Sequence, residues 1–331
     1  MILILCESKD LSVSEVIDWI SFLGYNYKRV NTDHLIDGNY TLKLNNDQVS
    51  YQSNSITDDI SMIWYRGGSE VSSYKYPVLE KINAAKSRMI YNSMKMEKKM
   101  LKKSLYDNVL EKEWLSNPLQ IDKLNKISTL RLAKECGVDI PSSLITNSKQ
   151  ELLDFLNEHK ELIVKPIYEA YDFNLHKEEI YMEYTSSISL PFIQKLETTF
   201  FPSLFQERLQ KEFEIRSFYL DGDFYSMAIF SQNDSQTEVD FRRYNTEKPN
   251  RSVPFKLPEN IEKKLNKLMR TMELKTGSID IVKTKDGRYV FLEVNPIGQF
   301  GMVSGICNYN LEKIIATYLI KNEKWKKQVK S

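Results

Sequence analysis

Two carboxylates near the C-terminal end of the chain are the first residues whose spacing suggests chemistry. Asp286-Gly287 has the composition of a two-residue hairpin turn between alternating strands, so the pairing register places Asp280 directly opposite Glu293. Like charges at directly opposed positions of a sheet repel each other. A divalent cation removes this conflict, and the sequence therefore predicts a metal site on this hairpin.

Asn295 lies two residues beyond Glu293, on the same face of the predicted strand, where it adds a neutral oxygen. Carboxylate and amide oxygens, completed by phosphate oxygens, form the set of ligands that Mg²⁺ accepts. The apolar residues of the hairpin are expected on the opposite face, as one core layer: Ile279, Ile281, Leu292 and Val294. The alternative is an acidic pair exposed to solvent and balanced by nearby lysines, which needs no metal.

One lysine stands where a long cation is unusual. Lys165 ends a continuous apolar run directly before Pro166, within a predicted strand at residues 161–166. Taken alone, this pattern is typical of a strand-end lysine whose ammonium group extends to solvent.

Two further charged groups lie in the C-terminal third. Glu214 and Arg216 share one face of a strand that precedes the turn Asp221-Gly222, and an exposed ion pair is one interpretation of them. Asp240 and Arg242 belong to a charged segment without a clear period, which predicts a loop. A basic loop near phosphates is one option among several for that segment.

The elements that position these residues fall into three stretches, residues 1–118, 119–203 and 204–331. The first stretch begins as a βαβ unit and predicts an α/β domain. Its expected elements are strands at 2–6, 27–30 and 61–65, a helix at 14–23 and long helices from about 76 to 115. Gly67-Gly68 follows the last of these strands without the glycine spacing of a nucleotide loop, so we interpret it as a plain turn.

Composition excludes several classes of protein. Lys and Arg number 46 against 45 Asp and Glu, a net charge of +1, which argues against a surface built to hold nucleic acid or anionic lipid. No apolar run approaches the roughly 20 residues that span a bilayer. The cysteines are odd in number and far apart, which predicts a reduced, cytoplasmic protein: Cys6, Cys136 and Cys307.

Four features, taken in order along the chain, resemble the nucleotide and metal motifs of the ATP-grasp ligases: Lys165, Gln206-Glu207-Arg208-Leu209, Asp280 and Glu293-Val294-Asn295-Pro296. The tail from Asn295 to Glu312 resembles more narrowly the graspetide maturases, above all those of grasp-with-spasm systems. The resemblance covers nearly the whole chain and includes Trp64-Tyr65-Arg66 and Asp240-Phe241-Arg242. It implies the α/β (α+β) ATP-grasp fold, preceded by a Rossmann-like pre-ATP-grasp domain.

The activity implied by this resemblance is that of an ADP-forming ligase that phosphorylates Asp or Glu side chains of a ribosomally made precursor peptide. A Thr or Ser hydroxyl, or a Lys amine, then attacks the acyl phosphate and closes an ester or amide ring. The resemblance implies ATP and Mg²⁺, with two ions, as cofactors. The precursor, with its leader and core, is the implied partner, and a homodimer is one oligomeric state that fits.

The resemblance also implies roles in holding the nucleotide. Lys126 and Lys165 would hold the α- and β-phosphates, and Glu212 would take the ribose hydroxyls. The adenine would meet backbone groups of Gln206, Glu207, Arg208 and Leu209. The Mg²⁺ ligands would be Asp280, Glu293 and Asn295.

At the acceptor end, Arg216 and Arg242 would hold the substrate carboxylate or acyl phosphate, and Asp240 would receive the proton of the attacking hydroxyl. One departure from the family pattern is that residues 167–189 contain no Gly, where these enzymes usually close a Gly-rich loop over the phosphates. We interpret this segment as a mobile lid or as part of the peptide site.

Two other functions stay open. A RimK-like ligase that adds amino acids to a small acid or a protein tail would use the same ATP and metal residues. A nucleotide- and peptide-binding module without turnover is the non-enzymatic alternative, although keeping Asp280, Glu293 and Asn295 together argues against it.

Overall fold

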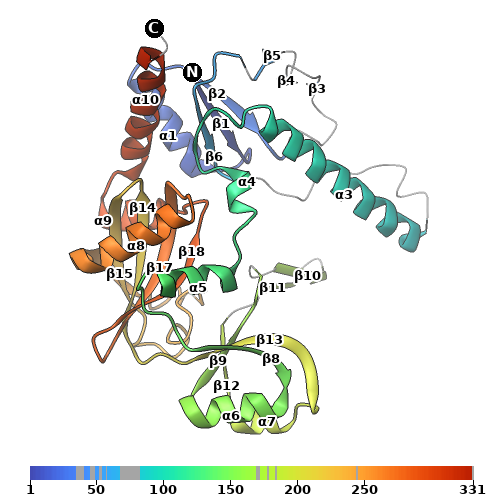
Figure 1. Cartoon of the computed structure of the whole chain (residues 1–331), viewed down its shortest axis with the longest axis vertical. Helices are drawn as coiled ribbons and strands as arrows, with labels where there is room; N and C mark the ends of the chain where they lie inside the picture. The colour runs from blue at the N-terminus through green and yellow to red at the C-terminus, as the bar shows by residue number, and fades with distance from the viewer. Residues whose placement is uncertain are drawn as a thin grey trace.

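The structure is a computed structural model that describes residues 1–34, 41–44, 49–51, 54–56, 58–67, 83–168, 172–176, 179–182, 185–243 and 245–329. Figure 1 shows three layers of the molecule along its long axis. An N-terminal sheet lies at the top beside helix α10, a larger sheet lies in the middle, and a small sheet with helices α6 and α7 lies at the bottom. The division at residues 118 and 203 stays a prediction.

The N-terminal sheet is parallel throughout, with the order β2-β1-β6-β7. Its strands are β1 (Ile2–Cys6), β2 (Tyr27–Asn31), β6 (Met62–Tyr65) and β7 (Glu113–Leu115). The predicted βαβ start is confirmed, with helix α1 (Leu11–Phe22) between β1 and β2. The helix begins three residues before the predicted start because the Asp10 side chain accepts a hydrogen bond from the Val13 amide and caps it.

Both faces of this sheet are covered. Ile2 and Ile4 pack toward α1 and the C-terminal helix α10 (Leu311–Val329), while Leu3 and Leu5 pack toward the end of helix α3. Of the helical stretch predicted at residues 76–115, helix α3 (Ala84–Asp107) is confirmed and residues 76–82 lie outside the described residues. The end of the stretch is wrong, because residues 113–115 form strand β7, and the short helix α4 (Pro118–Ile121) follows it. A separate small sheet joins β3 (Leu42–Leu44), β4 (Val49–Tyr51) and β5 (Asn54–Ser55).

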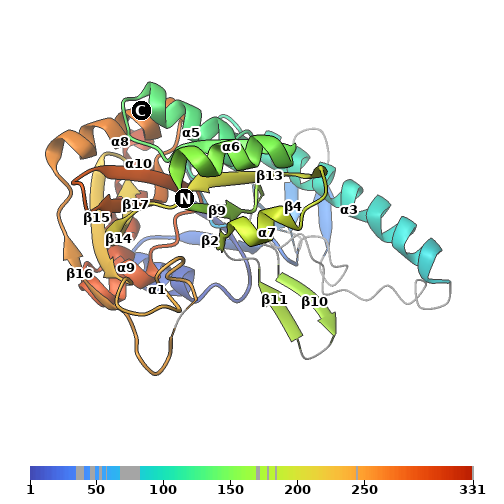
Figure 2. The ribbon, with the colours of Figure 1, turned by 90° about the horizontal axis from the view of Figure 1, so that it is seen from below.

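The small sheet at the bottom of the molecule is antiparallel, with the order β12-β9-β13-β8. Its strands are β8 (Ser143–Ser148), β9 (Leu162–Lys165), β12 (Ser186–Ile188) and β13 (Thr199–Glu207). Helices α6 (Lys149–His159) and α7 (Leu190–Gln194) pack against it through a core that includes Leu152 and Phe205. The hairpin of β10 (Asp172–His176) and β11 (Glu179–Met182) projects away from these helices (Figure 2).

The large sheet is antiparallel, with the order β16-β15-β14-β17-β18. Its strands are β14 (Lys211–Leu220), β15 (Asp223–Phe230), β16 (Arg251–Phe255), β17 (Thr276–Thr284) and β18 (Tyr289–Asn295). One face, with Ile215 and Ile279, packs against α5 (Lys126–Glu135) and α8 (Glu259–Thr271). The other face, with Phe218 and Met227, packs in part against α9 (Gly301–Cys307) and α10.

The two predicted hairpins have different outcomes. The two-residue turn Asp221-Gly222 is confirmed, since Leu220 pairs with Asp223 and both turn residues have positive φ, +48° and +116°. The two-residue turn at Asp286-Gly287 is wrong. The loop has three residues, 285–287, because the Thr284 amide donates to the Arg288 carbonyl at 3.0 Å and the Thr284 side chain binds the Arg288 amide.

Candidate active site

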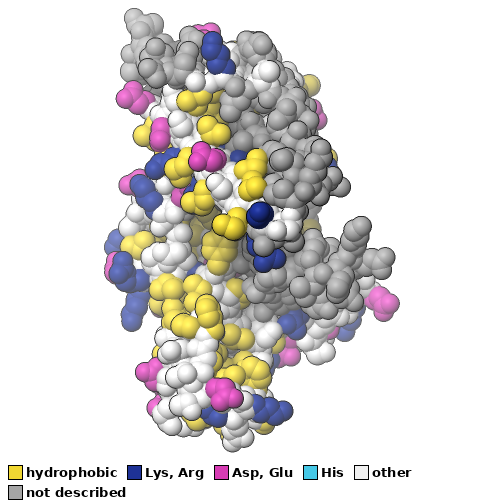
Figure 3. All heavy atoms as spheres, turned by 90° about the vertical axis from the view of Figure 1, so that its right-hand side faces the viewer, with side chains coloured by type: hydrophobic (Ala, Val, Ile, Leu, Met, Phe, Trp, Pro, Cys, Tyr) yellow, Lys and Arg dark blue, Asp and Glu magenta, His cyan; other side chains and the backbone are white. Residues whose placement is uncertain are grey.

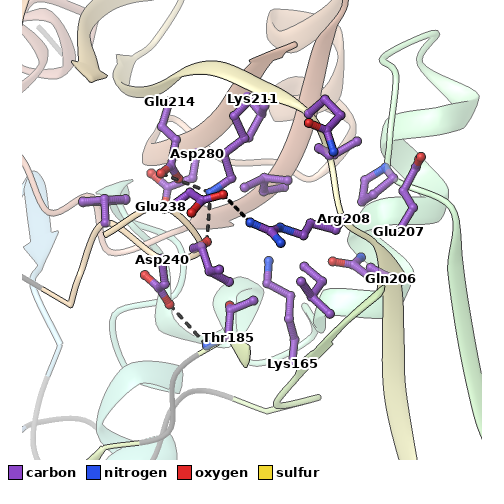
Figure 4. Close-up of a pocket in the computed structure, with 18 of the residues that line it drawn as sticks. Lys165, Thr185, Gln206, Glu207, Arg208, Lys211, Glu214, Glu238, Asp240 and Asp280 are labelled. Carbon is purple, nitrogen blue, oxygen red and sulfur yellow. Dashed lines mark hydrogen bonds and ion pairs between the residues drawn. The ribbon is translucent and has the colours of Figure 1, made fainter. Parts of the chain in front are cut away.

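A cleft of about 800 Å³, counting space open to solvent, lies between the small sheet and the large sheet. The small sheet contributes Ile163 and Lys165 of β9, the large sheet contributes Asp280 and Glu293, and the loop at residues 231–243 closes one side. Figure 4 shows Lys165 pointing into this cleft from one wall, with Asp280 and Glu214 on the opposite wall. Charged side chains of the two sheets therefore face one another across one cleft.

The predicted opposition of Asp280 and Glu293 across β17 and β18 is confirmed. The predicted pairing register is correct at these residues because two one-residue offsets cancel. The three-residue turn shifts the pairing by one residue near the turn, where Ile281 pairs with Phe291, and a β-bulge at Leu292 restores the predicted register from Asp280 onward.

The bulge also changes which side chains face the cleft. Leu292 and Glu293 both line it, so the prediction that Leu292 belongs to the opposite core layer is wrong. Leu292 packs instead with Leu209, Val282 and Val290, and the first two of these form an apolar wall of the cleft together with Leu292. The other predicted members of the core layer, Ile279, Ile281 and Val294, pack against α5 and α8 as predicted.

The two opposed carboxylates have different protonation behaviour. Burial raises the pKa of Asp280 to about 6; the nearby charge of Glu293 acts in the same direction, and Arg216 opposes it. Burial acts to raise the pKa of Glu293 too, but Lys165 and Lys126 outweigh it and hold that pKa below its usual value. In the ligand-free site, Arg216 therefore does not fully offset the burial of Asp280.

Two lysines approach this pair from different elements. Lys126, the first residue of α5, places its Nζ 3.4 Å from the Glu293 carboxylate and donates to the Pro166 carbonyl at 3.0 Å. Lys165 lines the cleft, and burial lowers its pKa, although the charge of Glu293 opposes this shift. The interpretation of Lys165 as a solvent-directed strand-end lysine is therefore wrong, because its side chain faces the cleft.

Asp280 has the donor atom that a metal ion needs. Its Oδ1 is buried and makes no hydrogen bond among the described residues. The described residues hold no group of three or more His, Cys, Asp or Glu side chains that could bind a metal on its own. Two carboxylates fit Mg²⁺ that arrives with phosphate oxygens, since Mg²⁺ is usually bound through one or two carboxylates. Asn295 lies beside this pair on β18 but outside the cleft lining, and its Oδ1 accepts a hydrogen bond from the Ile297 amide.

The predicted adenine segment lies along the cleft. Gln206, Glu207, Arg208 and Leu209 all line it. Their positions are fixed from the small sheet, because the Gln206 amide donates to the Ser143 hydroxyl at 2.9 Å and the Arg208 backbone amide donates to the Glu161 carbonyl at 2.9 Å. Leu209 adds an apolar surface suited to a purine ring.

Glu212, the predicted ribose ligand, does not join this group. Its side chain is exposed and lies outside the residues that line the cleft. The carboxylates on that side of the cleft are Glu207, which accepts from the Ser142 amide at 2.9 Å, and Glu238, which forms an ion pair with Arg208.

The interpretation of Glu214 and Arg216 as an exposed pair is wrong, because both residues are buried. Glu214 is bound instead by Lys211, at 3.2 Å, and by the Ser231 hydroxyl, at 2.7 Å. Arg216 lies opposite Asp280 on the neighbouring strand, and its Nη2 donates to the Gln299 side chain at 2.9 Å.

Asp240 and Arg242 are joined to each other in the predicted loop. The Arg242 guanidinium donates to both carboxylate oxygens of Asp240, at 2.9 and 2.6 Å. Although burial acts to raise the pKa of Asp240, the hydrogen bonds and charge of Arg242 hold it below its usual value. The Thr185 amide also donates to Asp240, at 3.3 Å, so this loop is fastened to the segment before β12 (Figure 4).

Sequence reasoning missed several residues of the cleft, among them Lys211, Glu238 and Thr185. Lys211 stands beside a bulge of β14 and donates to the Val239 carbonyl at 2.9 Å, which ties the charged loop to the sheet. The strand pattern did not place Lys211 on the same face as Glu214, because the bulge between them breaks the two-residue period. The Gly-free segment 167–189 is described only in part, as β10, β11 and β12 with flanking residues, and its interpretation as a lid stays a prediction.

No protein-family model and no curated protein sequence matches this chain. Solved structures do. A RiPP-associated ATP-grasp ligase of Chryseobacterium gregarium, in complex with ADP and a leader and core peptide, has 21% sequence identity and a TM-score of 0.81 over 97% of this chain and 96% of its own. The macrocyclase MdnC of Microcystis aeruginosa MRC, bound with the precursor peptide MdnA, has 24% identity and a TM-score of 0.80 over 97% of this chain and 99% of its own.

The ATP-grasp ligase PsnB, complexed with a minimal precursor, Mg and ADP, has 17% identity and a TM-score of 0.75 over 97% of each chain. These similarities extend over all three layers rather than over a single sheet, and they agree with the predicted α/β fold. The chain therefore has the fold of the ATP-grasp ligases.

Proposed function

We propose that this chain is an ATP-dependent, ADP-forming ligase that joins side chains of a ribosomally made precursor peptide into rings. The observation that carries the proposal is one cleft lined by Lys165 and by the opposed carboxylates Asp280 and Glu293, with Arg216 beside Asp280 but outside the lining. Phosphoryl transfer to a carboxylate brings anions together, so it needs such preorganised cations. The fold similarity to ligases crystallised with precursor peptides supports the choice of substrate.

In the first step, an oxygen of the substrate carboxylate attacks the γ-phosphorus of ATP, and ADP leaves. Lys165 and Lys126 are proposed to hold the phosphates, with the adenine against Leu209 and the segment from Gln206 to Arg208. Asp280 and Glu293, with Asn295 beside them, would hold Mg²⁺, which supplies charge neutralisation at the phosphates when bound. Arg216 is proposed to hold the carboxylate as it is phosphorylated.

In the second step, a Thr or Ser hydroxyl, or a Lys amine, attacks the acyl carbon, and inorganic phosphate leaves. Asp240 is proposed to receive the proton, because its lowered pKa keeps it ionised at neutral pH. Arg242 is bound to Asp240 in the ligand-free protein. We propose that its guanidinium turns to the acyl phosphate when substrate is present. The net change is loss of one water from the peptide for each ring, with ATP converted to ADP and phosphate.

The test is mass spectrometry of a candidate precursor peptide, with leader and core, incubated with the enzyme, ATP and Mg²⁺. We expect successive losses of one water mass, each accompanied by one ADP. Asp280→Asn is the matched negative control, since it keeps the side-chain shape and removes the charge. ADP release without any loss of water from the peptide would contradict the proposal and favour another acceptor.

We further propose that two Mg²⁺ ions accompany the nucleotide. The support is that two carboxylates, Asp280 and Glu293, occupy adjacent strands, and each can contribute to one ion together with phosphate oxygens. Titration of Mn²⁺ into enzyme with a non-hydrolysable ATP analogue, followed by electron paramagnetic resonance, counts the ions. A stoichiometry of one ion per chain would contradict this part of the proposal.

A homodimer is proposed on the basis of helix α3. Met89, Met96 and Met100 lie on this helix and are 73%, 60% and 51% exposed. Figure 3 views the molecule from the side toward which α3 projects and shows hydrophobic side chains exposed among basic ones. Light scattering of the wild type and of Met96→Glu tests this: we expect a dimer that the substitution dissociates, and a monomeric wild type would contradict it.

We propose a cytoplasmic location, because ATP and a newly made peptide meet there. The three cysteines, Cys6, Cys136 and Cys307, are buried and free of disulfides, which fits a reducing compartment. Among the described residues, no helix has both the length and the apolar composition needed to cross a membrane. Fractionation of producing cells tests the location, and recovery with the membrane or the medium would contradict it.

A further inference from the structure

The side chain of Arg66 connects the N-terminal sheet to the turn that follows β18. It is 7% exposed, and its Nη1 donates to the carbonyls of Ile297 and Gly298, at 2.7 Å each. On its other side the guanidinium lies 3.6 Å from the Asp10 carboxylate and donates to the Ser12 hydroxyl at 3.3 Å. A buried arginine that binds two carbonyls on another part of the chain fixes the position of that part.

Other hydrogen bonds also shape the turn at residues 295–299, among them the one from the Ile297 amide to the Asn295 side chain at 3.1 Å. The Gly298 amide donates to the Asn295 carbonyl at 3.1 Å, and the Ser278 hydroxyl donates to the Gln299 carbonyl at 2.6 Å. Gly298 has φ of +74°, and a Cβ added there would lie 3.0 Å from the Thr276 hydroxyl and 3.1 Å from the Phe218 ring. The turn is therefore closely packed against β17 and β14, with Arg66 on its outer side.

The last residue of this turn contacts Arg216, which lies beside Asp280 of the cleft. Gln299 Oε1 accepts the hydrogen bond from Arg216 Nη2 at 2.9 Å, and Arg216 Nη1 lies 3.9 Å from Asp280 Oδ1. The Nε of Arg216 is buried and has no partner among the described residues. Gln299 is therefore one of few contacts that set the direction of the Arg216 guanidinium.

We propose that Arg66 is a positioning residue for the ligase reaction, acting through Gln299 on Arg216. The proposal rests on the proposed function of Arg216 as the group that holds the substrate carboxylate. Arg66 does not line the cleft, so its loss is expected to leave nucleotide binding intact. What it changes is the alignment of Arg216, and therefore turnover.

The test compares Arg66→Lys with a matched substitution in the same domain. Arg29 is also well connected, because it donates to the carbonyls of Glu7 and Ser8 at 3.0 Å each, but its hydrogen bonds stay within the N-terminal sheet layer. We expect Arg66→Lys to lower kcat for ring formation by about tenfold or more while the Kd for ADP·Mg²⁺ stays within about threefold. Arg29→Lys is expected to leave both values close to those of the wild type.

A double-mutant cycle tests the path through Gln299. If Arg66 acts through Gln299, the combined Arg66→Lys/Gln299→Ala variant is about as slow as Gln299→Ala alone. Without the Gln299 side chain, the Arg66 substitution can no longer affect the alignment of Arg216. Full multiplication of the two losses would overturn the proposal. So would a kcat for Arg66→Lys within about twofold of the wild type.

Hydrogen–deuterium exchange separates failure of this inference from failure of the proposed function, because it needs no substrate. Amides of residues 297–300 are expected to exchange faster in Arg66→Lys than in the wild type or Arg29→Lys. If wild-type enzyme forms no rings, the proposed function fails while the exchange result still reports on the turn. Unchanged exchange at these amides would overturn the inference even if ring formation is observed.

Discussion

Arg216 and Asp280 lie directly opposite each other on β14 and β17, with Nη1 3.9 Å from Oδ1, and Glu293 occupies the next position of the same row on β18. The row runs across three adjacent strands as one cation followed by two anions. Arg216 cannot balance both carboxylates, so the row has an excess of negative charge that Lys126 and Lys165 meet from the side of Glu293. This asymmetry explains why Asp280 is the carboxylate with the raised pKa.

The first prediction concerns stability. Asp280→Asn is expected to stabilise the ligand-free protein by about 1–2 kcal/mol at neutral pH, because it removes a buried charge that Arg216 does not fully balance. The substitution also removes the partner of Arg216, so the gain in the free energy of unfolding is smaller than the free energy that corresponds to the full pKa shift. Urea unfolding at constant pH, without nucleotide or metal, measures it, and Asp286→Asn in the exposed turn is the control.

The pH dependence of that difference follows from the sign of the shift. The pKa of Asp280 is raised from 3.8 to about 6 in the folded protein, so between these values the folded state binds more protons than the unfolded state. Wild-type stability therefore falls as pH rises through this window, and the Asn variant lacks this contribution. The difference between the two proteins should vanish below about pH 4 and be constant above about pH 6 to 7. A difference independent of pH would contradict the assignment.

The second prediction concerns catalysis. Asp280→Asn, Glu293→Gln and Lys165→Ala are each expected to abolish loss of water from the precursor, because each removes a charge needed at the phosphates, at a loss of several kcal/mol. Lys283→Ala, on β17 near the turn, is the control for removal of a lysine and should retain activity. Full activity in any two of the three variants would remove this site from the reaction.

The third prediction concerns the acceptor arginines. Arg216→Lys and Arg242→Lys keep the charge but lose the planar fork that binds two oxygens. Nucleotide affinity should survive, while ring formation falls by about tenfold or more, equivalent to about 1.4 kcal/mol in the transition state. Arg288→Lys, at the exposed end of the hairpin, is the matched control. Rates close to the wild type in both variants would exclude these arginines from the acceptor site.

The fourth prediction distinguishes two carboxylates near the nucleotide. Glu212 is exposed outside the cleft lining, whereas Glu238 lines the cleft and pairs with Arg208. We therefore expect Glu238→Gln to change ATP affinity more than Glu212→Gln, as measured by calorimetry with a non-hydrolysable analogue. The reverse order would restore Glu212 as the ribose ligand and require a rearrangement of β14 on binding.

The fifth prediction separates capture of the peptide from its chemistry. The leader of the precursor is expected to bind without ATP, on a surface outside the acidic hairpin. Asp280→Asn should then leave leader affinity within about threefold of the wild type, since the two sites are not in contact. Calorimetry with the isolated leader peptide measures this, and a loss of affinity of about tenfold would mean that leader and metal share one site.

The sequence alone was enough to predict the ATP-grasp fold, the βαβ start and the opposition of Asp280 and Glu293. The first two depend on the order of motifs along the chain and on the period of apolar residues. The opposition was predicted correctly only because the bulge at Leu292 offsets the extra residue of the turn. The turn Asp221-Gly222 is an example of a reliable local signal. Both residues have positive φ, which Gly and Asp tolerate, so the composition of the turn predicts its conformation. The residues proposed for catalysis also came from sequence, but their shared location did not.

Tertiary structure decided which faces were buried and which charges met. The bulge at Leu292 turns an apolar residue predicted for the core into the wall of the cleft, and no local pattern distinguishes a bulge from a regular strand. Glu214 and Arg216 were predicted as a surface pair, but two other segments supply Ser231 and Gln299 as their partners. Burial and pKa depend on the sum of such distant contacts, so a strand pattern alone cannot give them. Arg66 and Gln299, 233 positions apart in the sequence by their numbers, act on one guanidinium only because folding brings the N-terminal sheet against the turn after β18.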